Sequence, residues 1–398
     1  MTSENRRTAD EAVGTSAGAL FELVRSARAV TRSELALATG LSRTAVAARL
    51  DALLALGLLT AGPQVTSTGG RPSESLRVAH DAGVVVAIAI GRSRHQIGVH
   101  DLLGGELGSV SAEHEVGSPA AALMPRIVAV ARDLLAATAS GRTVVGIGMS
   151  LPGSVDPEEV CSVGSPVLPG WDGVPLEPFL RELGTAPVWL GNDADALAHA
   201  EILGRPELRD ALVLKASTGL GLGLVADGRI LRGHRGAAGE LGHCRVPEAA
   251  GRACRCGATG CLETVAGGWA LVADHAERHP EAGLRHVREL VDLARRGDAE
   301  ARGLIRDAGR HLGPSLAFGV NLLNPEAIVV GGDLVGAFDV LAGGIRETLF
   351  PAAGELATRD LRILPSVHRE RAGLVGCAAL ALDHALAPHA IDLRVARR

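Results

Sequence analysis

The stretch Glu240-Leu-Gly-His243, followed after ten residues by Cys254-Arg-Cys256-Gly-Ala-Thr-Gly-Cys261-Leu-Glu263, decides how the body of this chain is built. One histidine and three closely spaced cysteines are a tetrahedral donor set that suits zinc, and four protein ligands make a closed, structural site. Chance clustering and a disulfide are the alternatives, although nothing marks the chain as secreted. The pattern predicts one structural zinc ion, bound by His243, Cys254, Cys256 and Cys261, with Cys244 as a rival ligand.

The composition allows a large core and more than one domain. Of 398 residues, 47% are hydrophobic and 21% charged, which is typical of two or three globular domains. Residues 1–80 hold nine Arg and seven Asp or Glu, a net charge of +2. The whole chain has a net charge of −5, so the remaining residues carry a net charge of −7. A mildly basic N-terminal unit on an acidic body favours a small DNA-binding head. Lys215 is the only lysine among 40 basic residues, and we interpret this as coding bias.

The sequence has no recognisable targeting or membrane segment. No apolar region follows the arginines of MTSENRRTADEA, and no uncharged run of about 20 apolar residues occurs. Cysteines that cluster as metal ligands fit a reducing compartment. We therefore expect a cytoplasmic protein with no membrane contact.

Residues 15–80 have the pattern of a mostly α-helical, winged helix-turn-helix domain, after a polar segment, residues 1–14, that we expect to be disordered. Helices are predicted at 17–28, 32–39 and 43–56. Thr31 and Glu34 have the spacing of a capping box, and Ser42 is placed to cap the third helix. Strands near 58–60 and 76–78 would form the wing. An ordinary three-helix bundle with a hairpin is the alternative.

The third of these helices has the position of a recognition helix, which enters the DNA major groove. Val46 and Leu50 would face inward, and the wing tip would bring an arginine to a narrow minor groove. The residues predicted to contact DNA are Ser42, Arg43, Thr44, Arg49 and Arg71.

From residue 82 the pattern changes to alternating strands and helices. Strands are predicted at 84–90 and 96–101, and a third runs through Val110. A helix at 119–138 and a buried strand at 144–149 follow. A similar order of strands recurs from residue 211 and ends in a strand at 327–330. The body is therefore predicted to be α/β, with two related halves.

These motifs resemble those of the ROK family (repressors, open reading frames and sugar kinases), and the resemblance extends from residue 17 to about 385. It rests on the zinc signature, the Gly-Arg-Pro wing tip, Asn192-Asp193 and the loop at 217–221. It implies a two-lobed, actin/hexokinase-like body at 81–388 behind the head. Lobe 1 would comprise about 81–195 with a C-terminal helix at 373–388, and lobe 2 about 196–372.

The resemblance also implies a sugar site in the cleft between the lobes. It assigns sugar binding to Asn192, Asp193, Glu240, His243 and Glu263. In the kinases of the family, the Asp of Asn-Asp is the general base, so Asp193 is its equivalent. From the residues alone, Asn192-Asp193 at a strand-to-helix junction is equally well explained as a plain N-cap. His243 can turn one ring nitrogen to zinc and the other to a hydroxyl.

One departure from the kinase pattern bears on activity. Where the kinases carry Asp-x-Gly-Gly-Thr, this chain reads Ala89-Ile-Gly-Arg92-Ser93. Ala89 cannot organise magnesium, and Arg92 would crowd a loop that has to approach phosphate closely. We therefore expect a sugar-responsive transcriptional regulator without enzyme activity, most simply a repressor. Its partners would be operator DNA and a sugar or sugar derivative, and it would act as a homodimer or a dimer of dimers. The alternatives are an ATP-dependent sugar kinase of glucokinase or N-acetylhexosamine kinase type, and a DNA-binding protein with a vestigial cleft.

Overall fold

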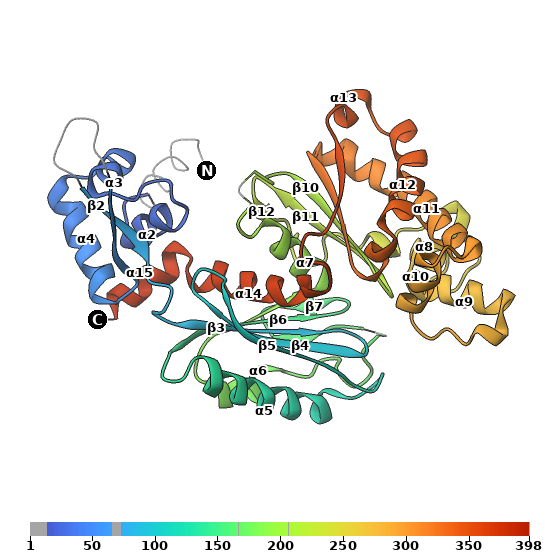
Figure 1. The fold of residues 1–398 in the computed structure, drawn as a ribbon, viewed down its shortest axis with the longest axis horizontal. Helices are drawn as coiled ribbons and strands as arrows, with labels where there is room; N and C mark the ends of the chain where they lie inside the picture. The colour runs from blue at the N-terminus through green and yellow to red at the C-terminus, as the bar shows by residue number, and fades with distance from the viewer. Residues whose placement is uncertain (1–13, 66–72, 166, 206, 398) are drawn as a thin grey trace.

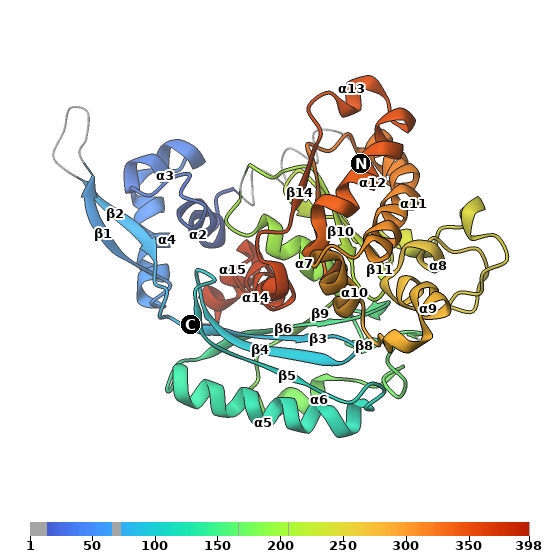
Figure 2. The same cartoon turned by 45° about the vertical axis from the view of Figure 1, so that its right-hand side comes forward.

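The computed structural model describes residues 14–65, 73–165, 167–205 and 207–397. A small head lies beside two stacked α/β lobes (Figure 1). The expected disordered segment 1–14 falls, apart from Gly14, outside these residues, and so does Arg71 at the tip of the wing. Figure 2 shows the two strands of the head projecting away from the body.

The head consists of three helices and a two-stranded antiparallel hairpin. Its elements are α2 (Ala17–Arg25), α3 (Arg32–Thr39), α4 (Arg43–Ala55), β1 (Leu59–Val65) and β2 (Ser73–Val78). Thr31 and Glu34 form the predicted capping box, and Ser42 Oγ accepts the amide hydrogen of Ala45 at 3.2 Å. Each cap satisfies amide groups that the first helical turn leaves unpaired, which fixes where the helix begins. The predicted order of helices and wing strands is confirmed.

The sheet of the first lobe has the strand order β5-β4-β3-β6-β9. Its strands are β3 (Val84–Ile90), β4 (Arg94–Asp101), β5 (Glu106–Glu113), β6 (Val144–Leu151) and β9 (Val188–Asn192). The central strand β3 is buried along its whole length, because α5 (Ala120–Thr138) covers one face and α14 (Ala372–Ala385) the other. Burial on both faces explains its uninterrupted apolar sequence. Shorter elements of this lobe are β7 (Val155–Asp156), β8 (Cys161–Ser162) and α6 (Glu177–Leu180).

The second lobe repeats this arrangement with the strand order β12-β11-β10-β13-β14. Its strands are β10 (Ala211–Ala216), β11 (Leu220–Ala226), β12 (Arg229–Ile230), β13 (Ala327–Gly331) and β14 (Arg362–Pro365). Its helices are α8 (Glu263–Ala266), α9 (Gly268–Arg278), α10 (Val287–Arg295), α11 (Ala299–Leu323), α12 (Phe338–Ala352) and α13 (Glu355–Thr358). The long helices α11 and α12 pack on its outer face. Two sheets with this common order form the two-lobed, actin/hexokinase-like fold that the sequence predicted.

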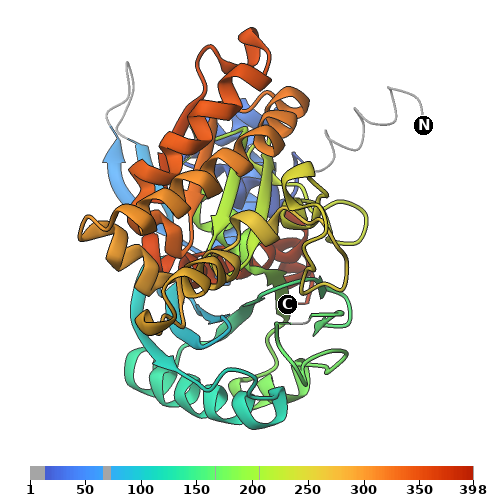
Figure 3. The ribbon, with the colours of Figure 1, turned by 90° about the vertical axis from the view of Figure 1, so that its right-hand side faces the viewer.

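Two helices from distant parts of the chain lie between the two sheets. α7 (Asp193–Ile202) follows the last strand of the first sheet and packs against both α14 and the second sheet. At Gly376 on α14, a Cβ atom would lie 1.7 Å from the carbonyl oxygen of Ala196, so only glycine permits this close approach. Figure 3 shows the lobes one above the other.

The C-terminal helix joins the body to the head. The structure ends α14 at Ala385 and begins a further helix, α15 (Pro388–Ala396), where the sequence suggested a single helix at 373–388. A proline at the first helical position favours this new start. α15 packs against α2, and the amide of Gly18 donates a hydrogen bond to Asp392 Oδ1 at 2.7 Å. The head therefore packs against α15.

Within the described ranges, no single helix has the length and apolar composition needed to cross a bilayer. One pair bent by 52°, Arg369–Ala385 with Pro388–Ala396, meets that test by length and composition alone.

Candidate functional site: the interlobe cleft and the metal cluster

A cavity of about 1110 Å³ lies between the two lobes. It is lined by residues from the ends of β3, β6, β9 and β10, and by the loop that carries the cysteines. All five residues predicted to bind sugar line it: Asn192, Asp193, Glu240, His243 and Glu263. The structure therefore brings together side chains that are far apart in the sequence, at the place where ligands bind in two-lobed α/β folds.

The four predicted zinc ligands form one compact cluster beside this cavity. The ligand atoms of His243, Cys254, Cys256 and Cys261 all lie within 4.8 Å of one another. The Sγ atoms of Cys256 and Cys261 are 3.8 Å apart, which is about the edge of a tetrahedron with zinc–sulfur bonds of about 2.3 Å. The donor set therefore fits a tetrahedral zinc ion. Cys244, the rival ligand, points elsewhere, with its Sγ 3.9 Å from the carbonyl oxygen of Glu240.

His243 connects the metal cluster to the cleft. Its Nδ1 lies 3.8 Å from Cys254 Sγ, whereas its Nε2 lies 3.9 Å from Glu240 Oε2. Glu240 also accepts a hydrogen bond of 3.1 Å from the hydroxyl of Ser154 on the first lobe. One ring nitrogen therefore faces the metal position and the other faces the cleft, as the sequence interpretation required.

Asn192 and Asp193 stand at the start of α7, and both already have protein partners. Asn192 Oδ1 accepts the amide hydrogen of Asp195 at 2.6 Å, which makes Asn192 the N-cap of the helix. Asp193 Oδ2 lies 2.7 Å from Nζ of Lys215. The N-cap explanation therefore holds for Asn192. Its side-chain amide hydrogens have no partner among the described residues, so they remain available to a ligand.

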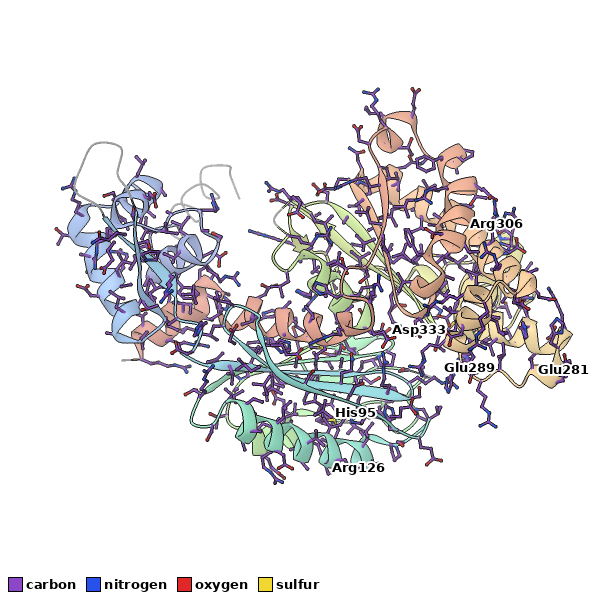
Figure 4. The ribbon with its side chains drawn as sticks, viewed as in Figure 1. His95, Arg126, Glu281, Glu289, Arg306 and Asp333 are labelled. Carbon is purple, nitrogen blue, oxygen red and sulfur yellow. The ribbon has the colours of Figure 1, made fainter. Side chains whose placement is uncertain are left out.

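Lys215 is a site residue that the sequence interpretation missed. Burial alone would lower its pKa, but Asp193 first, and Asp333 and Glu263 after it, raise that pKa above its usual value. A charged ammonium group therefore lies on the floor of the cleft. Asp333, which also accepts a hydrogen bond from the Ser217 hydroxyl, is on the edge of the second lobe that faces the first sheet (Figure 4). The occurrence of one lysine among 40 basic residues, interpreted above as coding bias, is the signal that could have marked this residue.

Glu263 is held in place by two hydrogen bonds. Its Oε2 accepts the amide hydrogen of Leu220, and its Oε1 accepts the indole N–H of Trp269, both at 2.9 Å. Glu263 as a whole residue is 8% exposed. It anchors the loop to β11 and α9, and each oxygen keeps a second lone pair that can accept a sugar hydroxyl.

The face of Trp269 carries a second cleft residue, Arg255. The guanidinium carbon of Arg255 lies 4.5 Å from the centre of the indole ring, a cation–π contact. Burial lowers the pKa of Arg255, and the charge of Arg92 on the opposite lobe lowers it further. Both arginines line the same cavity, one from each lobe.

The turn after β3 is the stretch in which the sequence departs from the kinase pattern. Ala89, near the end of β3, offers only a methyl group to the cavity, and Arg92 projects from the turn that follows. The turn is closed by a 2.8 Å hydrogen bond from the amide of Gly91 to the carbonyl oxygen of Arg94. No carboxylate stands at position 89 to hold a magnesium ion.

In the head, the predicted DNA-contacting residues fall into two groups. Ser42, Arg43 and Thr44 are exposed at the N-terminus of α4. Arg49, in contrast, turns its guanidinium inward, where it donates hydrogen bonds to the carbonyl oxygens of Thr15 and Ala45. The side chain of Arg49 thus serves to hold α4 against the start of α2.

A chain of charged side chains that the sequence analysis did not predict runs from the cleft to the head. It begins at Asp195, whose amide is bound by Asn192, and whose carboxylate lies 3.7 Å from Arg232 Nε. Arg232 Nη2 is 3.1 Å from His199 Nε2, and His199 Nδ1 is 3.2 Å from Asp383 on α14. A His199 ring with its proton on Nδ1 fits both of these partners.

The last link of this polar chain crosses from the body to the head. Asp383 Oδ1 lies 3.7 Å from Nη1 of Arg25, the last residue of α2. Burial raises the pKa of Asp195 to about 6, although Arg232 and His199 oppose the rise. We call the set Asp195, Arg232, His199, Asp383 and Arg25 the relay.

Comparison with known proteins identifies the family. The ROK family profile matches residues 85–384, three quarters of the chain. The chain belongs to the ROK family. The xylose repressor of Bacillus spizizenii is 25% identical to it over 361 residues, which cover 90% of this chain and 92% of the repressor.

Solved structures of ROK proteins give the same picture. A ROK family transcriptional regulator, a homologue of the E. coli MLC protein, superposes with a TM-score of 0.81 at 26% identity, covering 98% of this chain and all of that one. A ROK family glucokinase from Streptomyces griseus, in complex with glucose and AMPPNP, reaches 0.63 at 28% identity and covers 75% of this chain and 99% of its own. The regulator thus matches head and body together, whereas the kinase matches a length equal to the body alone.

Proposed function

We propose that this protein is a sugar-responsive transcriptional repressor. The head binds operator DNA, a sugar or sugar derivative binds in the interlobe cleft, and sugar binding lowers the affinity of the head for the operator. The match of head and body together to a ROK regulator, and to a xylose repressor over most of its length, supports this proposal.

The relay is the observation that carries the proposal. A sugar that bonds to Asn192 or Asp193 acts on the first turn of α7, where Asn192 caps Asp195. The relay connects that turn through His199 and Asp383 to Arg25 at the end of α2. An effector can change DNA affinity only if it binds one arrangement of the protein better than another, and a charged chain between the two sites is a physical means of linking those arrangements.

Two further features fit the same function. A zinc ion held by His243 and the three clustered cysteines would fix the loop that presents His243 and Glu263 to the sugar. Exposed Ser42, Arg43 and Thr44 at the start of α4 are in the position from which recognition helices contact base edges. Recognition of a palindromic operator calls for two heads, so we propose a homodimer or a dimer of dimers.

A sugar kinase is the second candidate, because Asp193 and the cavity match the body of ROK kinases. Two observations oppose it. Ala89 supplies no carboxylate for magnesium, and one oxygen of Asp193 is occupied by Lys215. A coupled assay with ATP and glucose, xylose or N-acetylglucosamine tests this candidate. Turnover that disappears in Asp193→Asn would make the protein a kinase, and no turnover above a protein-free blank is expected.

The direct test of the repressor function uses an operator selected in vitro from random duplexes. Fluorescence anisotropy gives the operator Kd at fixed salt, with and without each of a panel of sugars and sugar phosphates. We expect nanomolar binding that one ligand of the panel weakens, and loss of binding in Arg43→Ala. A protein that selects no sequence from the library, or whose operator Kd none of the ligands changes, is not a sugar-responsive repressor.

A further inference from the structure

A second cavity lies where the head meets the body. Its volume is about 380 Å³, which is within the range of small-molecule sites. The head contributes Leu56 and Leu58, which follow α4, and the end of α15 contributes Arg394 and Arg397. The remaining wall comes from the first lobe. In Figure 2, α15 lies between the head and one end of the sheet of that lobe. We call this space the junction cavity.

The junction cavity and the interlobe cleft lie at opposite ends of the same strands. Ser150 and Asn192, at the carboxyl ends of β6 and β9, line the cleft. Val144, which begins β6, and Pro187, which precedes β9, line the junction cavity. Val144 and Ser150 are separated by about 20 Å along β6, at about 3.3 Å per residue. The junction cavity is therefore a separate space and not an extension of the cleft.

The wall of the junction cavity carries two cations without counter-ions. Among its described lining residues, only Arg394 and Arg397 are ionisable. Neither has an ion pair or a side-chain hydrogen bond with any residue that the structure describes. Asp392, the acid of the same helix, instead accepts the amide hydrogen of Gly18 on α2. Burial lowers the pKa of Arg394, and no carboxylate opposes this effect.

The lining indicates the chemistry of a ligand. A cation that is partly withdrawn from water without a counter-ion is costly, and an anion that binds beside it reduces that cost. Arg394 and Arg397 have the i, i+3 spacing that places two helical side chains on one face, so both can reach the same anion. Leu56, Leu58 and Val144 offer apolar surface to the rest of a ligand. An anion without an apolar body leaves this surface hydrated, and a neutral ligand leaves the cations unpaired.

We propose that the junction cavity binds a small organic anion with an apolar body and one carboxylate or phosphate group. The anionic group binds to Arg394 and Arg397, and the apolar body lies against Leu56 and Leu58 of the head and Val144 of the body. The ligand contacts the head, the first lobe and α15 at once, so it favours the arrangement in which these three are packed together and restrains the head there. This second site goes beyond the proposed function, and it requires neither a sugar in the cleft nor operator DNA.

The test is isothermal titration calorimetry with anions and their neutral partners. The pairs are benzoate with benzamide, hexanoate with hexanamide, and phenyl phosphate with phenol, while acetate and inorganic phosphate are anions without an apolar body. Arg394→Gln removes one charge, and Ala186→Leu enlarges a side chain of the first-lobe wall without a change of charge. Arg346→Gln is the control, because Arg346 is exposed on α12 and has no ion pair among the described residues. Thermal melting shows that each variant is folded.

We expect at least one apolar anion to bind wild type at least tenfold more tightly than its neutral partner and than acetate or phosphate. Arg394→Gln should weaken this binding by about tenfold to a hundredfold, the effect of a lost hydrogen bond to a charged group. Ala186→Leu should weaken it as well, by occupying the cavity, and Arg346→Gln should behave as wild type. Bound ligand should slow hydrogen exchange at the amides of residues 56–60 and 391–397, because it holds the head against α15.

Four results would overturn this inference. The first is a neutral partner that binds as well as its anion, and the second is acetate or phosphate that binds as well as the apolar anions. The third is unchanged binding in both Arg394→Gln and Ala186→Leu, which would place the ligand elsewhere. The fourth is no binding of any apolar anion.

Operator binding then tells which other role the two arginines have. If Arg394→Gln lowers the salt dependence of the operator affinity by about one phosphate contact, the arginines bind the DNA backbone. If the salt dependence is unchanged, they only stabilise the C-terminal end of α15. The proposed repressor function stands or fails by the response of the operator Kd to sugars, whichever of these results is found.

Discussion

The carboxylate of Asp193 lies 2.7 Å from the ammonium of Lys215, the only lysine in the sequence. The pair joins the start of α7 to β10 of the second lobe, so it ties the two sides of the cleft together at its floor. Any sugar that bonds to Asp193 shares that carboxylate with Lys215. Asp193, the predicted equivalent of a kinase base, is therefore one half of an ion pair in this structure.

Removal of Lys215 alone should destabilise the protein. In Lys215→Met, the carboxyl group of Asp193 loses its ion-pair partner in a site where its side chain is 22% exposed, and Asp333 and Glu263 lose the nearby positive charge. We expect a loss of about 1–3 kcal/mol in the free energy of unfolding, measured by urea denaturation. Asp193→Asn in the same background should recover part of it. Arg295→Met, which removes an exposed partner of Asp292, should change stability by no more than about 0.5 kcal/mol. Equal losses of stability in Lys215→Met and Arg295→Met would contradict the ion pair between Asp193 and Lys215.

The metal cluster predicts one zinc ion per chain. Cys261→Ser should abolish stoichiometric zinc and lower the melting temperature, because the ligands hold the loop that carries Glu263. Cys244→Ser should keep both zinc and stability, since this thiol is outside the cluster. Metal analysis by mass spectrometry, together with alkylation of the native protein, checks both variants. A wild-type protein without zinc, whose three clustered cysteines react freely, would rule the site out.

Asp195 predicts a specific pH dependence of stability. Its folded-state pKa is raised to about 6 by burial, against about 4 when unfolded. Between these values the folded state holds a proton that the unfolded state has lost, so stability falls as pH rises from about 4 to 6. The full cost is on the order of 3 kcal/mol above pH 6. Subtracting the stability curve of Asp195→Asn from that of wild type should isolate this fall. A flat difference curve over this window would contradict the raised pKa.

Arg43 and Arg49 should respond differently to removal, although both are on α4. Arg43 is exposed at the helix start, so Arg43→Ala should weaken operator binding by about 1–3 kcal/mol and leave stability unchanged. Arg49 bonds to the carbonyl oxygens of Thr15 and Ala45, so Arg49→Ala should cost about 1 kcal/mol of stability. Anisotropy and thermal melting measure the two effects. The reverse pattern would show that Arg49 is the arginine that reads DNA.

Much of the fold could be predicted because its signals are local. The capping box of Thr31 and Glu34 and the cap at Ser42 mark helix starts within a few residues, and a doubly buried strand such as β3 is apolar throughout. The cysteine spacing predicted the metal cluster for the same reason, since one short loop supplies three of its ligands. The wing strands were recognised but predicted too short, because strand ends depend on pairing across the hairpin.

What the sequence could not give depends on contacts between distant segments. The relay joins α2, α7, the loop that follows β12, and α14, and no periodicity relates Arg25 to Asp383. The inward turn of Arg49 follows from the position of Thr15, and the partner of Lys215 follows from the meeting of α7 with β10. α15 was not separated from α14, although Pro388 was the available signal.

The central claim is that a ligand in the cleft weakens operator binding through the relay. It is tested by the operator Kd of wild type and Asp383→Asn, with and without saturating ligand, alongside the ligand Kd from calorimetry. Asp133→Asn, an exposed change on α5, is the control. We expect ligand to weaken operator binding of wild type and control by about 5–150-fold. In Asp383→Asn, the ligand Kd and the operator Kd without ligand should stay as in wild type. The ratio of the operator Kd with ligand to the operator Kd without ligand should fall towards one. An unchanged ligand effect in Asp383→Asn would contradict the relay, and no effect in wild type would contradict the repressor function itself.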